Sequence, residues 1–382
     1  MDRDELAAWL RLELTPGVGN TTARQLLTAF GEPQRVFDAS ALAIEQVVGS
    51  KVRSALQQEP EPLASLLETT WQWLQSNPQQ HRVLTLGDPG YPQTLLNMED
   101  PPMLLYGLGP AQFWSGDALN RVTPRAIAVV GSRNPTPQGA INARQFAQAL
   151  ARVGVTIVSG LALGVDAAAH EGALEGAPDG QLATIAVVGT GLDRVYPRQH
   201  RDLSHRIAQR GVLLSEYPLG TPPMSANFPK RNRIIAGLGC ATLVVEAALQ
   251  SGSLITARQA SEQGKDVFAI PGSIHSTQAK GCHALIKQGA KLVESAQDIL
   301  EELGAAVGPP PDPSGAQPEG LPDSGDGNDL LEAMGFGPMG LDALQARTGL
   351  DTATLQAQLM ELELLGQLAR MPGGLFQRLV RI

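Results

Sequence analysis

Between residues 82 and 303, short apolar runs rich in β-branched residues alternate with segments of helical character. The runs are residues 126–130, 155–159, 184–188, 211–215, 242–246, 267–270 and 291–294. Continuous apolar runs of this length are typical of strands that are buried on both faces. Their alternation with helices is the pattern of a parallel sheet covered on both sides. The sequence therefore predicts an α/β protein with a doubly wound, mostly parallel sheet.

Four loops follow these strands at what should be one edge of the sheet, where doubly wound folds place their ligands. Their small residues, hydroxyls and free backbone N–H groups suit a phosphate, and Arg133 adds a guanidinium fork. A purely structural turn is the alternative at each loop, and the G-x-G of residues 189–191 is weak by itself. Asp166 is predicted to cap the following helix. The candidate phosphate-binding residues are Gly131, Ser132, Arg133, Ser159, Gly160, Gly164, Ser251, Gly252 and Ser253.

The most basic stretch of the chain is F-P-K-R-N-R, residues 228–233, which leads directly into the apolar residues Ile234 and Ile235. Pro229 favours an extended approach to a helix that begins with cations. The positive end of a helix dipole disfavours such cations by a few tenths to about 1 kcal/mol each, so an anionic ligand explains them better than a structural role. A solvated charge cluster is the alternative. The candidate residues here are Lys230, Arg231, Asn232 and Arg233.

The net charge of the chain is −9, which argues against attraction of nucleic acid by the whole surface. Any anion site must therefore be local. Apolar runs of about 20 residues are absent, and the start M-D-R-D-E-L lacks the features of a signal peptide, so we expect a cytoplasmic protein without membrane contact. The two cysteines, Cys240 and Cys282, suggest neither a disulfide nor a metal site. No cofactor is expected.

Three further sections flank or follow the sheet region. Residues 1–75 predict a small helical domain, in which Pro16, Gly17 and Gly19 resemble a helix-hairpin-helix turn and Asn20 or Thr21 caps the next helix. Contact with a DNA phosphate and simple helix packing both remain open for it. Residues 304–329 predict a disordered, proline-rich linker. Residues 330–382 predict a winged helix whose third helix, 351–365, has no Lys or Arg, which favours protein contact over duplex reading.

Taken in order, blocks from residue 82 to 295 closely resemble the DprA (Smf) family of DNA-processing proteins. They include A-V-V-G-S-R, I-V-S-G-L-A-L-G-V-D-A-A-A-H, F-P-K-R-N-R-I-I-A-G-L and V-V-E-A-A-L-Q-S-G-S-L-I-T-A-R-Q-A. The resemblance implies an extended Rossmann-like core that forms a homodimer and binds single-stranded DNA. It also implies protection of incoming DNA and loading of the RecA recombinase during natural transformation, with single-strand-binding protein as a further candidate partner.

Residue by residue, the resemblance assigns DNA contact to Arg133, to Arg198 of the Y-P-R block, and to Lys230, Arg231 and Arg233. It also suggests dimer or recombinase contacts at Ile274, His275 and Leu285. The local sequence I-H-S-T-Q-A-K departs from the family pattern there, which weakens this second assignment. Tyr196, Tyr217 and Phe228 lie close to the basic segment and could either stack on bases or belong to the core.

Two enzyme classes are the alternatives. A nucleotide or nucleoside-monophosphate hydrolase of the cytokinin-activating type needs P-G-G-x-G-T-x-x-E, whereas this chain has S-G-S-L-I-T-A-R without the glutamate. A nicotinamide oxidoreductase needs G-x-G-x-x-G followed by an acid, and that signature is missing. The histidines are scattered, and none is assigned chemistry. The sequence therefore favours a binding protein without catalytic residues.

Overall fold

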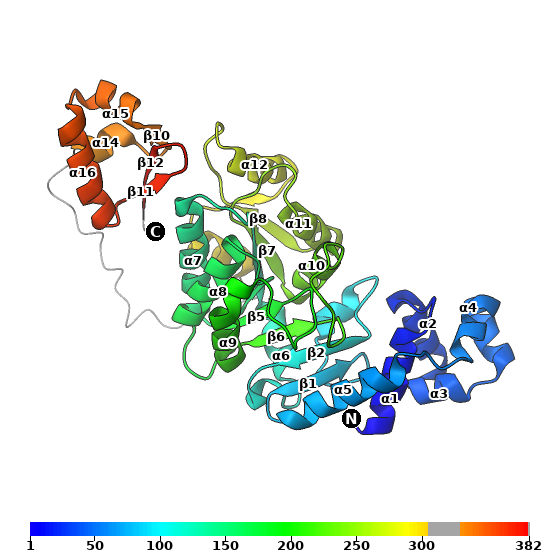
Figure 1. Ribbon diagram of the computed structural model, residues 1–382. Coiled ribbons are helices and arrows are strands. Elements are labelled where there is room, and N and C mark those ends of the chain that lie inside the picture. Colours follow the sequence, from blue (N-terminus) through cyan, green and yellow to red (C-terminus); the bar gives the residue numbers. More distant parts are fainter. Residues whose placement is uncertain (305–328, 381–382) are drawn as a thin grey trace.

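The computed structural model describes residues 1–304 and 329–380. Figure 1 shows a group of N-terminal helices at one end, a sheet covered by helices in the middle, and a small C-terminal domain at the other end. The predicted linker falls almost entirely on residues 305–328, outside the described residues. The predicted fold class, an extended Rossmann-like α/β core with a helical N-terminal part and a C-terminal winged helix, is confirmed.

The core is a sheet of nine strands within the described residues, in the order β1-β2-β6-β5-β4-β3-β7-β8-β9. Strands β3 to β9 run parallel. Each end of each strand lies within two residues of the end of the corresponding predicted run. The strands are β3 (Ile127–Val130), β4 (Ile157–Ser159), β5 (Thr184–Val187), β6 (Val212–Ser215), β7 (Ala241–Val244), β8 (Asp266–Ala269) and β9 (Lys291–Leu292).

Two strands at one edge were not among the predicted runs. β1 (His81–Thr85) pairs antiparallel with β2 (Leu104–Leu108), and β2 pairs antiparallel with β6. β1 begins with the polar, half-buried residues His81 and Arg82, so it lacks the continuous apolar signature of the parallel strands. These two strands extend the Rossmann-like sheet toward the N-terminal helices.

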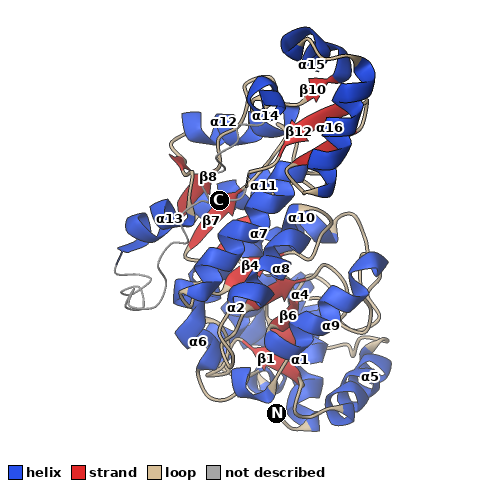
Figure 2. Ribbon diagram, turned by 90° about the vertical axis from the view of Figure 1, so that its left-hand side faces the viewer, coloured by secondary structure: helices blue, strands red, loops and turns tan. Residues whose placement is uncertain are grey.

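Helices cover both faces of the sheet, as Figure 2 shows from the side. Alternation within β3 divides the core, because Ile127 and Val129 pack on one face whereas Ala128 and Val130 pack on the other. The first face is covered by α7 (Pro137–Arg152), α8 (Val165–Gly176), α9 (Arg201–Arg210) and α13 (Ala296–Leu303). The second is covered by α6 (Ala118–Val122), α10 (Asn227–Leu238), α11 (Ser253–Glu262) and α12 (Lys280–Lys287).

The N-terminal helices form their own apolar cluster, which also includes Val83 of β1 and Leu104 and Tyr106 of β2. They are α1 (Arg3–Leu14), α2 (Asn20–Phe30), α3 (Pro33–Asp38), α4 (Ala41–Leu56) and α5 (Leu63–Ser76). The predicted helix cap by Asn20 or Thr21 is wrong, because α2 already begins at Asn20 and Gly19 precedes it without a side-chain bond. The helical part therefore rests on the antiparallel edge of the sheet.

The C-terminal domain has the predicted winged-helix outline. It contains α14 (Asp329–Met334), β10 (Met339–Gly340), α15 (Leu341–Thr348), α16 (Thr352–Leu364), β11 (Leu368–Met371) and β12 (Leu375–Arg378). β11 and β12 form the hairpin around Gly373 and Gly374, both with positive φ. Two hydrogen bonds of 2.8 Å join Val380 to the side chain of Gln138 on α7. Within residues 1–304 and 329–380, no helix combines the length and apolar character that a membrane span requires.

Candidate nucleic-acid interface

A cavity of about 520 Å³ lies at the carboxyl ends of β3 and β7. The chain proceeds from β3 to β6 on one side and from β7 to β9 on the other, so this is the topological switch point of the sheet. Open α/β sheets bind their ligands at such points. The walls are formed by Val130, Gly131, Ser132, Arg133, Asn134, Ala162, Asp166, Arg231, Asn232, Ile235, Ala248, Gln250, Ser251, Gly252, Ser253, Thr256 and Gln278.

The loop after β3 forms one wall, and it is tightly packed. A Cβ on Gly131 would lie 2.7 Å from a methyl carbon of Val165 and 2.9 Å from the Glu246 carbonyl oxygen, so only glycine fits there. Ser132 is buried, and its hydroxyl oxygen accepts a hydrogen bond from the Asn134 N–H (3.1 Å). Arg133 is exposed beside the cavity. The structure thus brings the first predicted loop to the cavity with its guanidinium facing solvent.

The loop after β4 contributes less than the sequence suggested. The Ser159 hydroxyl is buried and donates to the Val129 carbonyl oxygen (2.7 Å), so it is not free for a phosphate. Gly164 has a φ of 80° and packs against the loop at Ser132, and of residues 159–164 only Ala162 lines the cavity. Ser159, Gly160 and Gly164 therefore shape the site without facing it.

Asp166 does not cap α8, contrary to the prediction, because the helix begins one residue earlier, at Val165. Its carboxylate instead accepts hydrogen bonds from the backbone N–H groups of Gly160 (3.1 Å) and Ala162 (3.3 Å). These are the donors that a bound phosphate would otherwise use. Burial raises the pKa of Asp166, and the nearby charge of Arg231 and these hydrogen bonds act against that rise.

Arg231 is buried, unlike the solvent-facing arginine that the sequence suggested. Its guanidinium donates to the carbonyl oxygens of Gly160 (2.5 Å) and Val187, at the ends of β4 and β5. Burial lowers its pKa to about 10, so the side chain stays charged at neutral pH. A signal for this burial exists in the sequence, since Arg231, Ile234, Ile235 and Leu238 share the i, i+3, i+4, i+7 face of one helix. Arg231 therefore ties α10 to the sheet and forms the cavity floor.

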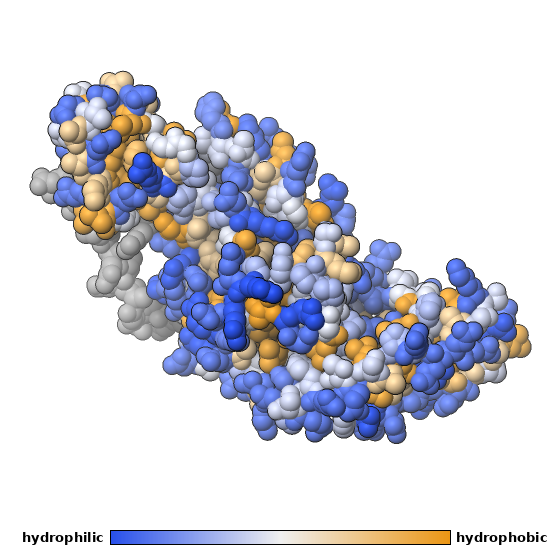
Figure 3. Space-filling view, viewed as in Figure 1, coloured by the Kyte–Doolittle hydropathy of each residue, from blue (hydrophilic) through white to orange (hydrophobic). Residues whose placement is uncertain are grey.

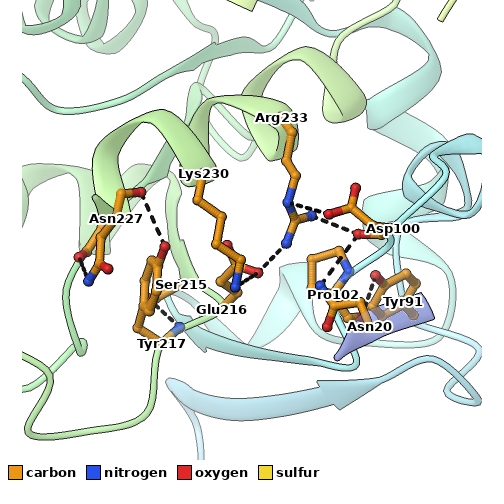
Figure 4. Close-up of polar contacts among 11 residues, drawn as sticks. Asn20, Tyr91, Asp100, Pro102, Ser215, Glu216, Tyr217, Asn227, Lys230 and Arg233 are labelled. Atoms are coloured by element: carbon orange, nitrogen blue, oxygen red, sulfur yellow. Dashed lines mark hydrogen bonds and ion pairs between the residues drawn. The ribbon is translucent and has the colours of Figure 1, made fainter. Parts of the chain in front are cut away.

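The basic segment is helical from Asn227 onward, so the extended approach predicted for Phe228-Pro229 is wrong. Pro229 fits into the first helical turn, where a backbone donor is not needed. Asn227 anchors this turn, since its amide donates to the Gly189 carbonyl oxygen (3.0 Å) and its carbonyl accepts from the Tyr217 hydroxyl (3.2 Å). Lys230 and Arg233 both reach toward Glu216 (Figure 4).

These two cations differ in availability. Arg233 is buried and contacts Glu216 and the Asp100 carboxylate (3.1 Å), so its charge is neutralised within the protein. Lys230 keeps about half of its side chain exposed, at 53%, and its ammonium lies 3.6 Å from Glu216. Lys230 is therefore the member of the K-R-N-R segment whose charge faces solvent.

Aromatic rings continue the exposed basic surface beyond the cavity. The guanidinium of Arg133 lies 5.5 Å from the ring centre of Phe228, and the Tyr196 ring lies 5.5 Å from the same ring. Tyr196 is 47% exposed, whereas Tyr217 is buried under the Lys230 ammonium. Of the three aromatic residues that the sequence singled out, Phe228 therefore lies beside Arg133, Tyr196 lies beside Phe228, and Tyr217 belongs to the core.

The opposite wall is the turn before α11. Ser251 and Ser253 hydroxyls are hydrogen-bonded to each other (2.7 Å), and the Asn232 amide donates to the Gly252 carbonyl oxygen (3.3 Å). Sequence reasoning did not single out Asn134, Gln250 or Gln278 as site residues. Asn134 and Gln250 lie within loops that it did examine, but Gln278 comes from a 3-10 turn, residues 277–279, and donates to the Asn134 carbonyl oxygen (3.1 Å). No local pattern marks Gln278, because only the fold brings it there.

The remaining candidates lie elsewhere. Arg198, in a 3-10 turn before α9, lines a different cavity. Ile274 and His275 are exposed on the loop after β8, and Ile274 is 66% exposed. Leu285, on α12, packs partly against the core and lines a third cavity. The structure therefore does not bring Leu285 to the loop that carries Ile274 and His275 as one exposed cluster.

Two carboxyl groups interact electrostatically with the basic helix, of which Glu216 is buried and Glu13 is half-buried. Burial raises the pKa of Glu216, and Arg233 and Lys230 counteract that rise. Glu13, on α1, has its pKa raised to about 8, first by burial and then by the negative charge of Glu216. One carboxyl oxygen of each residue is buried without a hydrogen-bond partner in the structure. The N-terminal helices therefore place an ionisable group close enough to Glu216 and Lys230 for their charges to interact.

This arrangement predicts a specific pH dependence of stability. The pKa of Glu13 is higher in the folded chain than in the unfolded chain, so folding stability should fall as pH rises from about 4.5 to about 8. Glu13→Gln removes the ionisation. We expect its melting temperature to equal that of the wild type near pH 5 and to exceed it by several degrees at pH 9, at roughly 2–4 °C per kcal/mol. Equal melting curves at pH 9 in scanning calorimetry would contradict the raised pKa.

The fold and this site define a Rossmann-like α/β protein whose ligand edge presents a glycine-serine cradle next to exposed cations and aromatic rings. The sequence model of the family described as DNA recombination-mediator protein A matches residues 82–304, and that of the DprA winged helix domain matches residues 309–374. The chain belongs to the DprA family of DNA recombination-mediator proteins.

Relatives and solved structures agree with this assignment. The chain is 35% identical to Protein Smf of Synechocystis sp. over 99% of its own length and 100% of that protein. It is 46% identical to DNA processing protein DprA of Streptococcus pneumoniae over 56% of its own length and 72% of the relative. The structure of DNA processing protein A from Streptococcus pneumoniae superposes with a TM-score of 0.64 at 36% identity, covering 79% of this chain and 98% of the other.

A second solved structure comes from Helicobacter pylori. It is DNA processing protein A, studied for its single-stranded DNA binding mode, and it superposes with a TM-score of 0.51 at 32% identity. The match covers 58% of this chain and 95% of the other. The family, rather than any single feature of the cavity, thus connects this fold with DNA processing.

Proposed function

We propose that this protein binds single-stranded DNA along the surface formed by the cavity, Arg133, Lys230, Phe228 and Tyr196. The observation that carries the proposal is that Arg133, in the glycine-serine loop that lines the cavity, lies beside the Phe228 ring. A cation beside the half-buried Phe228 ring and the exposed Tyr196 ring suits a strand whose phosphates and bases are both accessible, and a duplex hides its base faces. The related protein of Helicobacter pylori, studied for its single-stranded DNA binding mode, supports the same conclusion.

In the proposed complex, the strand backbone follows the cations and the bases lie on the rings. Arg133 offers a fork to one phosphate, and Lys230 offers a point charge to another. On the opposite wall the hydroxyls of Ser251 and Ser253 are bonded to each other, which leaves one hydroxyl of this pair to donate to the strand. Stacking on Phe228 and Tyr196 contributes about 1–3 kcal/mol per base and tolerates any sequence. Base identity is therefore read little.

Binding without catalysis is the second part of the proposal. The carboxylate in the cavity, Asp166, already accepts two backbone hydrogen bonds, so it is poorly placed to act as a general base on a substrate. His170 is fully buried, and burial lowers its pKa to about 3. These two observations favour a stoichiometric binding protein over the hydrolase alternative.

The wider role follows from family membership and from surfaces outside the cavity. We propose that the chain forms a homodimer, protects incoming single strands and loads RecA recombinase during natural transformation, in the cytoplasm. Ile274, 66% exposed, and Leu292, 50% exposed on the edge strand β9, are apolar surfaces available for protein contact. A dimer would present two strand-binding surfaces and raise avidity for long strands. Single-strand-binding protein is a further candidate partner.

The DNA-binding test compares the wild type with the double variant Arg133→Ala, Lys230→Ala. Fluorescent single-stranded and double-stranded oligonucleotides are titrated across a salt series. We expect single-strand preference, with a log-log salt slope of about −2 for roughly three neutralised phosphates. The double variant should lose on the order of 100-fold in affinity, and its slope should fall to about −0.7, because two charged contacts are removed.

A matched control is Arg82→Ala, which removes an arginine from β1, remote from the cavity lining. It should bind as the wild type does. Equal affinity for duplex and single strand, or a double variant that binds normally, would overturn the proposed function.

A further inference from the structure

A second cavity, of about 650 Å³, lies beside α9 and is separate from the switch-point cavity. Apolar side chains form its floor, among them Leu161, Val188, Leu192 and Leu213. Its rim carries Arg194, Arg198, Arg201 and His205, with Tyr196 beside them. In Figure 3, strongly hydrophilic side chains flank a hydrophobic patch near the middle of this face, close to where Figure 1 shows β5 and β6. An apolar floor with a cationic rim is the expected environment of a nucleotide.

The two cavities share one loop. Ala162 lines the switch-point cavity, whereas the preceding Leu161 lines the second cavity. Leu161 has a φ of 56°, an unfavourable region for a side chain with a Cβ. His200 holds it there, because its Nδ1 donates to the Leu161 carbonyl oxygen (2.9 Å). Strained residues that their surroundings fix in place are concentrated at binding sites.

Two of the three arginines on the rim form no ion pair among the described residues. Arg194 lies 3.3 Å from Asp193, but neither Arg198 nor Arg201 forms an ion pair among the described residues. Arg198 and Arg201 are exposed, and Arg201 is the first residue of α9, where the helix dipole disfavours a cation. Cations held there against the dipole, over an apolar cavity, indicate an anionic ligand with an apolar part.

The surface between the cavities is continuous. Tyr196 lines the second cavity and packs against Phe228, and Phe228 lies against Arg133 of the first. A single strand that stacks on these rings would therefore pass from one cavity to the other. This continuity favours a nucleotide of the same strand over a separate small molecule.

We propose that the second cavity binds one nucleotide of the same DNA strand, with its base on the apolar floor and its phosphate at Arg198 and Arg201. The inference rests on the proposed function, since it extends that binding surface. It also accounts for Arg198, which the switch-point cavity does not include. Because the floor is apolar, any base fits, and the cavity adds affinity without sequence preference.

The test uses the full-length protein and oligothymidylate in which single thymines are replaced by 5-iodouracil. Ultraviolet crosslinking followed by mass spectrometry should yield adducts at Tyr196 or His205 as well as at Phe228. Arg201→Ala should weaken binding of a 20-nucleotide strand about tenfold and reduce the adducts at Tyr196 and His205 selectively. Arg206→Ala is the control, because Arg206 lies on the same helix, pairs with Glu171 and does not line the cavity. Circular dichroism of each variant checks that it folds.

The outcomes separate this inference from the proposed function. If the wild type binds single strands and the Arg133→Ala, Lys230→Ala variant does not, yet Arg201→Ala behaves as Arg206→Ala does, the second cavity is not a strand site. Thymidine 5′-monophosphate alone is the second probe. Binding of this free nucleotide that Arg201→Ala abolishes, with strand affinity unchanged, would also overturn the inference, because the cavity would then serve a separate ligand.

Discussion

Arg231→Ala is expected to destabilise the core by about 3–5 kcal/mol, far more than removal of its neighbour Lys230. The guanidinium bonds the carbonyl oxygens of Gly160 and Val187, and these would be left without that donor. Asp166 would also lose the positive charge that favours its ionised form, although its carboxylate remains buried. A buried charge that loses its partner is among the costliest single changes.

Urea denaturation followed by circular dichroism measures this effect. Lys230→Ala is the matched control, since Lys230 is the adjacent residue and is half exposed, so its removal should cost about 1 kcal/mol or less. Arg231→Lys keeps the charge but cannot bond two carbonyl oxygens in a fixed fork, so it should fall between the two. An Arg231→Ala protein as stable as the wild type would show that the side chain is not a structural tie.

This distinction between adjacent cations illustrates what the sequence could and could not predict. Lys230, Arg231 and Arg233 are equivalent as charges, and the sequence therefore marked all three as ligands. Their burial depends on which side of α10 meets the sheet, and on Glu216 and Asp100, which come from distant segments. The helical spacing of Arg231 from the apolar residues of α10 could have predicted its burial. No local sequence pattern predicts the partners of Arg233.

The parallel strands were predictable for a physical reason. Strands β3 to β7 are buried along their whole length, so apolar residues dominate them, as in residues 127–130, which are all apolar. The same reasoning fails for β1, which is partly exposed at the sheet edge and carries polar residues at its start. Strand order also follows from pairing between distant segments, so the position of the switch point between β3 and β7 became visible only in the structure.

The glycine-rich loops were recognised correctly as belonging to the strand ends, but their individual roles were not. Three of the predicted phosphate ligands, Ser159, Gly160 and Gly164, are engaged within the protein or face away from the cavity. A small residue permits close approach of any group, and the sequence does not say whether that group is a phosphate or another loop. At Gly164 the approaching group is the loop at Ser132.

At Gly172 the group that approaches the glycine is another helix, so a substitution there tests whether the packing of α7 against α8 supports the site. α7 and α8 lie so close that a Cβ on Gly172 would overlap the Arg144 carbonyl oxygen and lie 2.8 Å from its carbonyl carbon. These are backbone atoms, so no rotamer change relieves the clash, and the two helices must separate. Alanine also favours a helix over glycine by about 1 kcal/mol, which opposes the cost. We expect the clash to win, with a net loss of about 1–3 kcal/mol.

The consequence should reach the binding surface, because both helices begin at the cavity loops. Thr136, directly before α7, is bonded through its N–H (2.8 Å) and hydroxyl to Glu246, and Gly164, directly before α8, packs against Ser132. Gly172→Ala should therefore weaken single-strand binding even at temperatures where the protein remains folded.

Thermal melts and strand titrations measure the two effects together. Gly87→Ala is the matched control, since a Cβ at Gly87 meets nothing within 4 Å and the residue is exposed, so stability and binding should hardly change. A Gly172→Ala protein that melts above the wild type would mean that helix propensity outweighs the contact. In that case α7 and α8 would not be held backbone to backbone, and the Ser132 loop and the start of α8 at Asp166 would owe their positions to other contacts.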